Sequence, residues 1–366
     1  MKCASEFRAR GITDALLREL AATVDRPLRI MEVCGTHTVS IFRSGLRSLV
    51  PEKLELISGP GCPVCVTPAG HVDAFVQAAR KEDVIVATFG DLIRVPGSDG
   101  SLAEAGSEGA TVEVVYSPMD ALALAQNNPE KTIFFPAVGF ETTAPTIAAT
   151  ILEANRLKIE NFCIFAGCKI MPPPLVALMS DPMLNVDGLL CPGHVSAIIG
   201  ADAYKPLAEK YHLPCAVAGF EPADIVAGLI SLARQVVAGQ ARVENCYTRV
   251  VSDEGNSRAR ELMYTVFTEE DTQWRGLGLI AGSGLGLRRK FARFDAINKL
   301  QLDLKPVPEP KGCRCGEILQ GHLLPPACPL YGRTCTPSRP IGPCMVSSEG
   351  TCAAYYRFSG DKHSVY

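Results

Sequence analysis

The chain has 366 residues, a formal net charge of −3 and 47% hydrophobic residues, the profile of a globular protein with enough apolar side chains for a core. At roughly 150 residues per domain, this length predicts two or three domains. The small negative charge excludes a chain-wide basic surface for nucleic acid or an anionic membrane. The apolar runs are far shorter than the roughly 20 residues of a membrane helix, and the charged N-terminus lacks the apolar core of a secretory signal. These features predict a soluble, cytoplasmic protein.

Strands and helices are predicted to alternate along most of the chain. Short runs of branched and aromatic residues predict buried strands at 28–33, 54–57, 84–88, 132–138, 162–166 and 216–218. Segments with helical spacing lie between them, at 71–80, 119–126, 144–156 and 223–237. Alternation of this kind predicts parallel sheets covered by helices on both faces, an α/β fold.

Two pairs of short segments echo each other, 69–74 with 192–197 and 138–141 with 218–221. We therefore expect two similar parallel-sheet, Rossmann-like domains, at residues 1–127 and 128–305. The segment 303–311 contains three prolines and predicts an extended linker. Around and beyond it we expect a small cysteine-rich domain, residues 306–366, that needs a metal to fold.

Fifteen cysteines are an unusually large number for a chain without an export signal. In a reducing compartment structural disulfides are rare, so these thiols predict packing, metal ligands or redox groups. Packing best explains four that lie singly beside apolar segments: Cys163, Cys168, Cys215 and Cys246. Packing does not explain the concentration of six others in the tail: Cys313, Cys315, Cys328, Cys335, Cys344 and Cys352.

The segment EVCGTHT, residues 32–38, directly follows a predicted strand. Ligand sites of parallel sheets lie at the carboxyl ends of strands, so we expect Cys34 to project into one, with Thr36 capping the next helix. A helix N-terminus favours the thiolate, and His37 can pair with it. Such a thiolate acts as a nucleophile or a metal ligand. The alternative is a buried cysteine with His37 on the surface.

The segment GPGCPVCVTP, residues 59–68, also follows a predicted strand and contains the C-x-x-C pair Cys62 and Cys65. Two such sulfurs can close a small disulfide ring or share a metal. Thr67-Pro68 places the start of the next helix near residue 69 or 70, so we expect the pair to lie in a loop. Because no second C-x-x-C follows at zinc-finger spacing, a redox dithiol is favoured over structural zinc or two inert thiols.

Loops of six to eight residues separate the last four cysteines, which are Cys328, Cys335, Cys344 and Cys352. Four thiolates in such loops can wrap an iron–sulfur cube, whereas structural zinc sites usually contain close cysteine pairs. The spacing therefore predicts an atypical [4Fe–4S] site in preference to zinc. Cys313 and Cys315 can supply a ligand instead, or form a second redox pair.

Three weaker signals carry less information. The segments 276–281 and 282–286 are rich in glycine but lack the context or the lysine of nucleotide-binding loops, so we interpret both as strand and turn. His194 follows another predicted strand. It either faces the same cleft as Cys34 or caps a helix, and the cap is the simpler interpretation.

Taken together, these motifs resemble the hydrogenase maturation protein HypD family. The resemblance runs from about residue 27 to the end and rests on five segments in the family's order: EVCGTHT, GPGCPVCVTP, VGFETTAPT, CPGHVSAIIG and CPLYGRTCTPSRPIGPCMVSSEGTC. It implies two similar α/β domains, a small third domain with a [4Fe–4S] cluster, and a scaffold on which the Fe(CN)2CO unit of [NiFe]-hydrogenases is built.

The resemblance also implies partners and site residues. A HypC-type chaperone would hold the iron together with Cys34, a HypE-type protein would deliver cyanide from a thiocyanate, and the hydrogenase large subunit would be served indirectly. Cys62 and Cys65 match the family's redox pair. The best match to the cluster ligands is the set Cys328, Cys335, Cys344 and Cys352.

Two other functions fit the same cysteines. One is an iron–sulfur thiol–disulfide oxidoreductase that acts on a protein disulfide, but it gives no role to the CGTH segment at 34–37. The other is a zinc-stabilised binding protein. The residues suit iron assembly independently of the resemblance, because soft thiolates suit an iron with strong-field diatomic ligands, and a cluster beside a dithiol can supply electrons.

Overall fold

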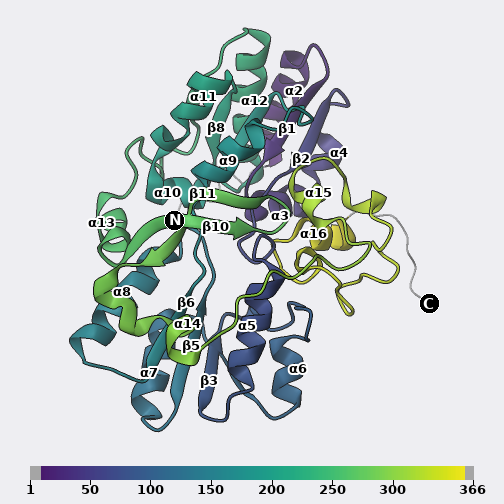
Figure 1. The fold of residues 1–366 in the computed structure, drawn as a ribbon. Helices are drawn as coiled ribbons and strands as arrows, with labels where there is room; N and C mark the ends of the chain where they lie inside the picture. Colours follow the sequence, from purple (N-terminus) through teal and green to yellow (C-terminus); the bar gives the residue numbers. More distant parts are fainter. Residues whose placement is uncertain (1–9, 359–366) are drawn as a thin grey trace.

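Two parallel β-sheets, each flanked by helices, form most of the protein in this computed structural model, which describes residues 10–358 (Figure 1). The α/β class predicted from the sequence is confirmed. Residues 1–9 and 359–366, at the outer ends of the first and last predicted domains, lie outside the described part. Among the described helices, none is long and apolar enough to cross a membrane.

The first sheet, sheet A, has five strands in the order β2-β1-β7-β8-β9, and all of its pairs are parallel. Its strands are β1 (Leu28–Glu32), β2 (Leu54–Ser58), β7 (Gly188–Pro192), β8 (Cys215–Ala218) and β9 (Val243–Asn245). The helices that precede or follow these strands are α2 (Arg10–Thr23), α3 (Gly35–Arg43), α4 (Leu46–Leu49), α9 (Pro172–Met179), α10 (Gly193–Ile199), α11 (Lys205–Tyr211) and α12 (Pro222–Val237).

The second sheet, sheet B, has four parallel strands in the order β4-β3-β5-β6. Its strands are β3 (Val84–Thr88), β4 (Thr111–Val114), β5 (Thr132–Ala137) and β6 (Phe162–Ala166). Its helices are α5 (Ala69–Ala79), α6 (Leu102–Ser107), α7 (Pro118–Asn127) and α8 (Ala144–Arg156). Pro118 occupies the first turn of α7, where Ser117 and Asp120 form a capping box that fixes the start of this helix.

A hairpin and a loop-rich tail complete the described chain. The last α/β segment contains α13 (Ser257–Val266), the antiparallel strands β10 (Phe267–Trp274) and β11 (Gly278–Leu287), and α14 (Ala296–Leu300). The glycine-rich stretch 276–286 is thus a turn and a strand, as predicted. The tail contains α15 (Cys315–Leu319) and α16 (Thr351–Phe358), connected by loops and single 3-10 turns.

The two sheets do not divide the chain where the sequence analysis divided it. Sheet B, built from β3 to β6, is inserted between the second and third strands of sheet A in chain order. β3 and β5 lie on opposite sides of residue 127 and pair directly, so a boundary at 127/128 would cut through sheet B. Helix α7 ends at this point and connects β4 to β5 within the same sheet, so its Asn-Asn-Pro stop marks the end of a helix and not a domain boundary.

One continuous apolar core joins both sheets to the tail. It contains Met31 and Ile57 of sheet A, Phe134 of sheet B, and the tail residues Cys344 and Met345. The tail also packs on α3, where the ring of Tyr355 meets that of Phe42 edge-on at 4.6 Å and Arg47 lies over both rings. The described tail is therefore tied to the rest of the molecule by packing as well as by any metal that it holds.

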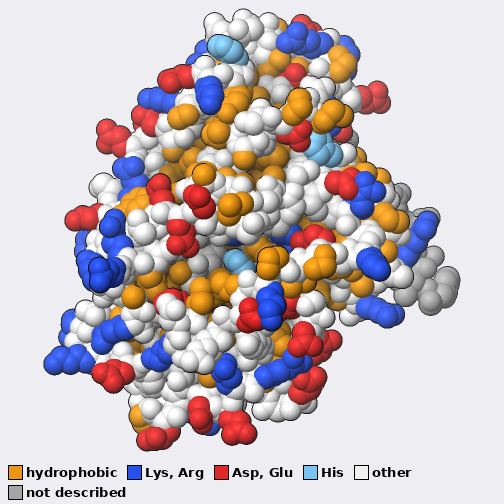
Figure 2. All heavy atoms as spheres, viewed as in Figure 1, with side chains coloured by type: hydrophobic (Ala, Val, Ile, Leu, Met, Phe, Trp, Pro, Cys, Tyr) orange, Lys and Arg blue, Asp and Glu red, His pale blue; other side chains and the backbone are white. Residues whose placement is uncertain are grey.

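Side chains on the face drawn in Figure 2 carry both signs of charge. Lys and Arg are interspersed with Asp and Glu over its upper and lower parts, while hydrophobic side chains gather toward the middle. This face has the mixed surface that the small net charge predicts.

Candidate functional site

Two loops meet at the carboxyl ends of β1 and β2. These strands pair in parallel from Leu28↔Leu54 to Glu32↔Ser58, so the CGTH loop and the C-x-x-C loop leave the same edge of sheet A. The N–H of Gly35 donates to the carbonyl of Gly61 at 3.0 Å. A Cβ on Gly61 would lie 2.5 Å from the backbone N and Cα of Cys34. The loops therefore touch through their backbones, and only glycine fits at residue 61.

This contact gives the first prediction. Gly61→Ala should destabilise the protein by about 1–3 kcal/mol, because the added methyl group must push the Cys34 backbone aside. Denaturant unfolding measures the change. Gly106→Ala is the matched control, since a Cβ there meets open space on α6, and it should leave stability unchanged or slightly raised. Equal stability of Gly61→Ala and wild type would contradict the close contact.

Cys34 is buried, with 7% of its surface exposed, and it is the N-cap residue of α3. Backbone N–H groups of Thr36 and His37 favour its thiolate, as expected at a helix N-terminus. Burial outweighs them, however, and raises the pKa of Cys34 to about 12. The helix N-terminus thus favours the thiolate as expected, but burial opposes it more strongly, so the protonated thiol is the favoured form at neutral pH.

The two neighbours predicted to assist Cys34 have other partners. Thr36 does not cap α3, because its hydroxyl donates to Glu349 Oε1 at 2.5 Å, across the interface with the tail. His37 is buried, and its Nε2 lies 2.9 Å from the Gly219 carbonyl beyond β8. Burial lowers the pKa of His37 to about 4, so it is a neutral ring.

His37 begins a row of three rings in tilted contact. The Phe220 ring lies 4.8 Å from the ring of His37 and 4.0 Å from that of His194, between centroids. His194 makes no side-chain cap on α10. It is exposed and follows β7, the neighbour of β1, so it lies at the same edge of sheet A as Cys34.

The C-x-x-C pair lies in the loop before α5, as predicted. The sulfurs of Cys62 and Cys65 are 2.7 Å apart, and the Cys65 N–H donates to Cys62 Sγ at 3.2 Å. Both side chains are buried, and Cys62 Sγ also lies 3.3 Å from Ser347 Oγ in the tail. Sulfurs this close can close a disulfide with little movement of the loop.

A line of thiols continues from this pair into the tail. Burial raises the pKa of Cys65 well above its ordinary value, and a hydrogen bond with Cys344 opposes that rise. The Cys344 sulfur is in turn 2.9 Å from that of Cys315. The sequence analysis assigned Cys344 to the cluster, whereas the structure places it between Cys65 and Cys315. No spacing in the sequence could reveal this, because Cys65 and Cys344 belong to segments far apart in the chain.

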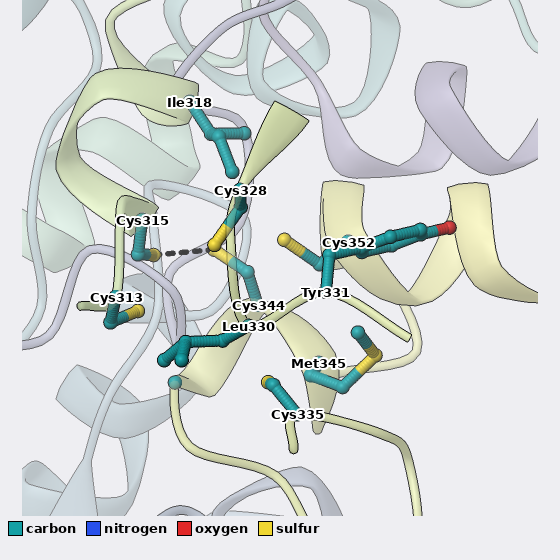
Figure 3. Close-up of a pocket in the computed structure, with 11 residues that line it drawn as sticks. Cys313, Cys315, Ile318, Cys328, Leu330, Tyr331, Cys335, Cys344, Met345 and Cys352 are labelled. Carbon is teal, nitrogen blue, oxygen red and sulfur yellow. Dashed lines mark hydrogen bonds between the residues drawn. The ribbon is translucent and has the colours of Figure 1, made fainter. Parts of the chain in front are cut away.

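Cysteine sulfurs also surround a cavity in the tail. Figure 3 shows six cysteine side chains that line it, with a dashed line joining two of them, Cys315 and Cys344; the others are Cys313, Cys328, Cys335 and Cys352. The cavity has a volume of about 20 Å³, and its other walls are apolar, including Ile318, Leu330 and Met345. The N–H of Ile341 donates to Cys335 Sγ at 3.3 Å. An apolar shell with N–H donors to sulfur is the environment that tunes iron–sulfur clusters.

One buried and one partly buried carboxyl group complete the surroundings of Cys34. Glu32 accepts hydrogen bonds from Thr38 at 2.8 Å and from Ser58 at 2.5 Å, and burial raises its pKa to about 8. Glu349 lies against Gly35, and burial raises its pKa also. The sequence analysis did not single out either residue, although Glu32 belongs to the EVCGTHT segment and its position at a strand end was a usable signal.

Comparison with known proteins identifies the family to which this arrangement belongs. A family model described as "HypD: Hydrogenase formation hypA family" matches residues 11–359. The chain belongs to the HypD family. It is 47% identical to Hydrogenase maturation factor HypD of Escherichia coli K12, over 98% of each chain. The protein of that name from Azotobacter vinelandii is 44% identical over 100% of this chain and 99% of its own, and that from Rhodobacter capsulatus is 44% identical over 98% and 99%.

The predicted site residues of this HypD-family chain fall into two groups. Cys34, Cys62 and Cys65 lie at one edge of sheet A, and the tail thiols lie beyond them. Within residues 10–358, no three His, Cys, Asp or Glu side chains are close enough to hold a single metal ion. The spread of sulfurs around the tail cavity suits a group larger than one ion, which fits a [4Fe–4S] cluster better than structural zinc.

Proposed function

We propose that this chain is a hydrogenase maturation scaffold that, with a HypC-type chaperone, holds iron on Cys34 while the Fe(CN)2CO unit of a [NiFe]-hydrogenase is assembled. One observation carries the proposal: the Cys34 loop and the C-x-x-C loop touch backbone to backbone at the ends of adjacent strands. This contact supports a shared buried site in which Cys34 holds the metal near a redox pair. The names of the relatives, hydrogenase maturation factors, support the same role.

The chemistry of Cys34 suits a transient metal site. The thiol is protonated in the free chain because it is buried, so iron must displace a proton when it binds. A soft thiolate favours low-spin iron with cyanide and carbonyl ligands over hard competing ions. Holding the second thiolate on a separate chaperone makes the site complete only in the complex, which allows the finished unit to be released toward the hydrogenase large subunit.

Cyanide transfer from a HypE-type partner needs electrons. When CN⁻ leaves a protein thiocyanate, its carbon–sulfur bond breaks and the sulfur takes up two electrons to leave as thiolate. Oxidation of the Cys62–Cys65 dithiol to a disulfide releases two electrons and two protons, which balances one transfer. The 2.7 Å separation of the two sulfurs supports this role.

The line of thiols supports a route by which the dithiol is restored. Exchange with the neighbouring Cys344 and Cys315 would pass the disulfide to that pair and return Cys62 and Cys65 to thiols. When bound, a [4Fe–4S] cluster supplies single electrons for the reduction of a disulfide. We propose that Cys313, Cys328, Cys335 and Cys352 hold it, because Cys344 is engaged with Cys315.

The dithiol gives the second prediction. After mild oxidation, the number of alkylatable thiols at Cys62 and Cys65 should fall by two, and reduction should restore both. Mass spectrometry after differential alkylation measures this. The matched control is the pair Cys191 and Cys215, which are buried and hydrogen-bonded on neighbouring strands of sheet A and should not change. If Cys62 and Cys65 stay reduced while maturation continues, the pair is structural.

Infrared spectroscopy tests the proposed function as a whole. The chain should be purified anaerobically with its small chaperone, and the complex should show cyanide and carbonyl stretches together with iron beyond that of a cluster. The alternative, an iron–sulfur thiol–disulfide oxidoreductase, predicts a brown protein without these bands. A cytoplasmic location, expected from the short apolar runs and the charged N-terminus, stays a prediction.

A further inference from the structure

A chain of three hydrogen-bonded groups joins the buried C-x-x-C pair to the surface. The thiol of Cys62 donates to Ser347 Oγ at 3.3 Å, and Ser347 Oγ donates to Asp91 Oδ2 at 3.2 Å. Cys62 and Ser347 are buried, with 3% and 1% of their surfaces exposed, whereas Asp91 is exposed. The chain of groups therefore begins at a sulfur with almost no access to water and ends at a carboxylate that water reaches.

Each of the three groups comes from a different part of the fold. Cys62 lies in the loop after β2 of sheet A, and Asp91 lies in a 3-10 turn, Gly90–Leu92, after β3 of sheet B. Ser347 belongs to the tail and lies between the 3-10 turn Pro343–Met345 and α16. The tail thus completes the chain of groups, because it brings a hydroxyl between a thiol and a carboxylate that belong to different sheets.

The neighbours of Ser347 fix the direction of its hydrogen bonds. A hydroxyl has one proton to donate and two lone pairs with which to accept. The backbone N–H of Glu349 can only donate, and it donates to Ser347 Oγ at 3.2 Å. The ionised carboxylate of Asp91 can only accept, so the Ser347 proton points to Asp91 and the remaining lone pair faces Cys62. A proton that leaves Cys62 therefore has a path that leads outward.

Cys62 is the sulfur of the pair that this path serves. The Cys65 N–H donates to Cys62 Sγ at 3.2 Å, and the Cys65 sulfur lies 2.7 Å from it. Donors directed at a sulfur favour its thiolate form. Burial raises the pKa of Cys65 well above its ordinary value, so Cys65 keeps its proton when Cys62 loses its own. Cys62 is therefore the thiol that becomes the attacking thiolate.

We propose that Ser347 and Asp91 conduct the proton of Cys62 to water when the C-x-x-C pair is oxidised. Ser347 Oγ takes up the thiol proton while its own proton passes to Asp91, and the exposed carboxyl group then releases that proton to water. Ser347 touches the reacting sulfur, and Asp91 acts through Ser347. The proposal rests on the function proposed above, in which a protein thiocyanate accepts the two electrons of the pair.

The rate at which a small neutral disulfide oxidises the pair tests the proposal. The purified full chain is mixed anaerobically with hydroxyethyl disulfide, and the free thiols of Cys62 and Cys65 are counted over time by differential alkylation and mass spectrometry. The Cys62 thiolate attacks one sulfur of the reagent and Cys65 displaces the other, so two electrons and two protons pass from the pair to two reagent thiols. Because the reagent has no charge, the charge of Asp91 neither attracts nor repels it.

Three variants and a matched control locate the path. Ser347→Ala and Asp91→Asn should each slow oxidation about tenfold or more, although asparagine keeps an oxygen that accepts hydrogen bonds. The double variant should be no slower than either single variant, because both changes interrupt the same path. The control is Ser348→Ala, which removes an exposed hydroxyl that donates to the same oxygen of Asp91 at 3.1 Å. It should be oxidised at the rate of wild type.

Two further results separate a proton path from a packing role. If Ser347 only packs the tail, Ser347→Ala would loosen the tail, expose Cys62 and speed its oxidation. In Asp91→Ala, added formate should restore part of the lost rate, because the missing side chain leaves an exposed position for a small carboxylate. Sodium chloride at equal ionic strength should not restore it, and formate should not restore the rate of Ser347→Ala.

The outcomes distinguish the path from the redox role of the pair. Unchanged or faster oxidation in Ser347→Ala and Asp91→Asn, or no effect of formate on Asp91→Ala, would overturn the proton path and leave the redox role intact. A wild-type pair that stays reduced in hydroxyethyl disulfide would overturn the redox role, and the path with it.

Discussion

Replacing Cys34 by alanine should abolish every cyanide and carbonyl infrared band of the complex with the small chaperone, together with its non-cluster iron. Cys34 lies at the end of β1, against Gly61 of the C-x-x-C loop, where a metal held by its sulfur would be next to the redox pair. An alanine leaves no donor there, and serine should do no better, because a hydroxyl is a hard ligand with a far higher pKa.

The same substitution should leave the tail intact. The tail packs on α3 through Tyr355 and Phe42, and its thiols line a separate cavity, so the brown cluster should remain at full content in Cys34→Ala. Cys168→Ala is the matched control, since Cys168 is equally buried and burial likewise raises its pKa to about 12, but it lies beyond β6 of sheet B. This control should keep all bands. Bands that persist in Cys34→Ala would move the iron site to Cys62 or Cys65.

Periodicity predicted the elements of this fold well. The strand at 84–88 and the helix at 144–156 have the predicted bounds, and the strands at 28–33 and 132–138 are one residue shorter in the structure. These segments have one strong signal each, either a run of branched residues or a long amphipathic repeat between stop signals. Local patterns fix such elements because neighbouring residues alone determine them.

The arrangement of the strands was not predictable in the same way. Nothing in the sequence of β3 states that it pairs with β5 and not with β2, its predecessor in the chain. Parallel strands all present similar apolar runs, so their order depends on packing between segments distant in sequence. The predicted boundary at 127/128 failed for this reason.

The candidate site likewise contains some features that the sequence could predict and others that depend on packing between distant segments. Cys34, Cys62 and Cys65 were predictable as a group because each follows a strand, and parallel strands bring their ends to one edge. His37 was expected to pair with Cys34, but its ring nitrogen instead lies against the carbonyl of Gly219, just beyond β8. The contact of Cys65 with Cys344 joins two loops whose approach depends on the docking of the whole tail.

The cluster ligands can be decided by counting iron and sulfide in single-cysteine variants. Wild type should contain about four of each per chain, and Cys313→Ala, Cys328→Ala, Cys335→Ala and Cys352→Ala should each lose the cluster. The tail should loosen in the same variants, measured as faster proteolysis, because metal binding supplies part of its folding free energy.

Cys344→Ala distinguishes two sets of cluster ligands. One is the set proposed above, and the other is the set predicted from the spacing of the last four cysteines. Because the Cys344 sulfur is 2.9 Å from that of Cys315, the function proposed above gives this pair a role in disulfide exchange and not in holding the cluster. Cys344→Ala should therefore keep full iron and sulfide while the restoration of reduced Cys62 and Cys65 slows, and Cys315→Ala should behave as its matched partner. Loss of the cluster in Cys344→Ala, with full content in Cys313→Ala, would restore the ligand set predicted from the sequence. A colourless wild-type protein that contains zinc would contradict both sets, since the thiols around the cavity would then hold a structural ion with no electrons to supply.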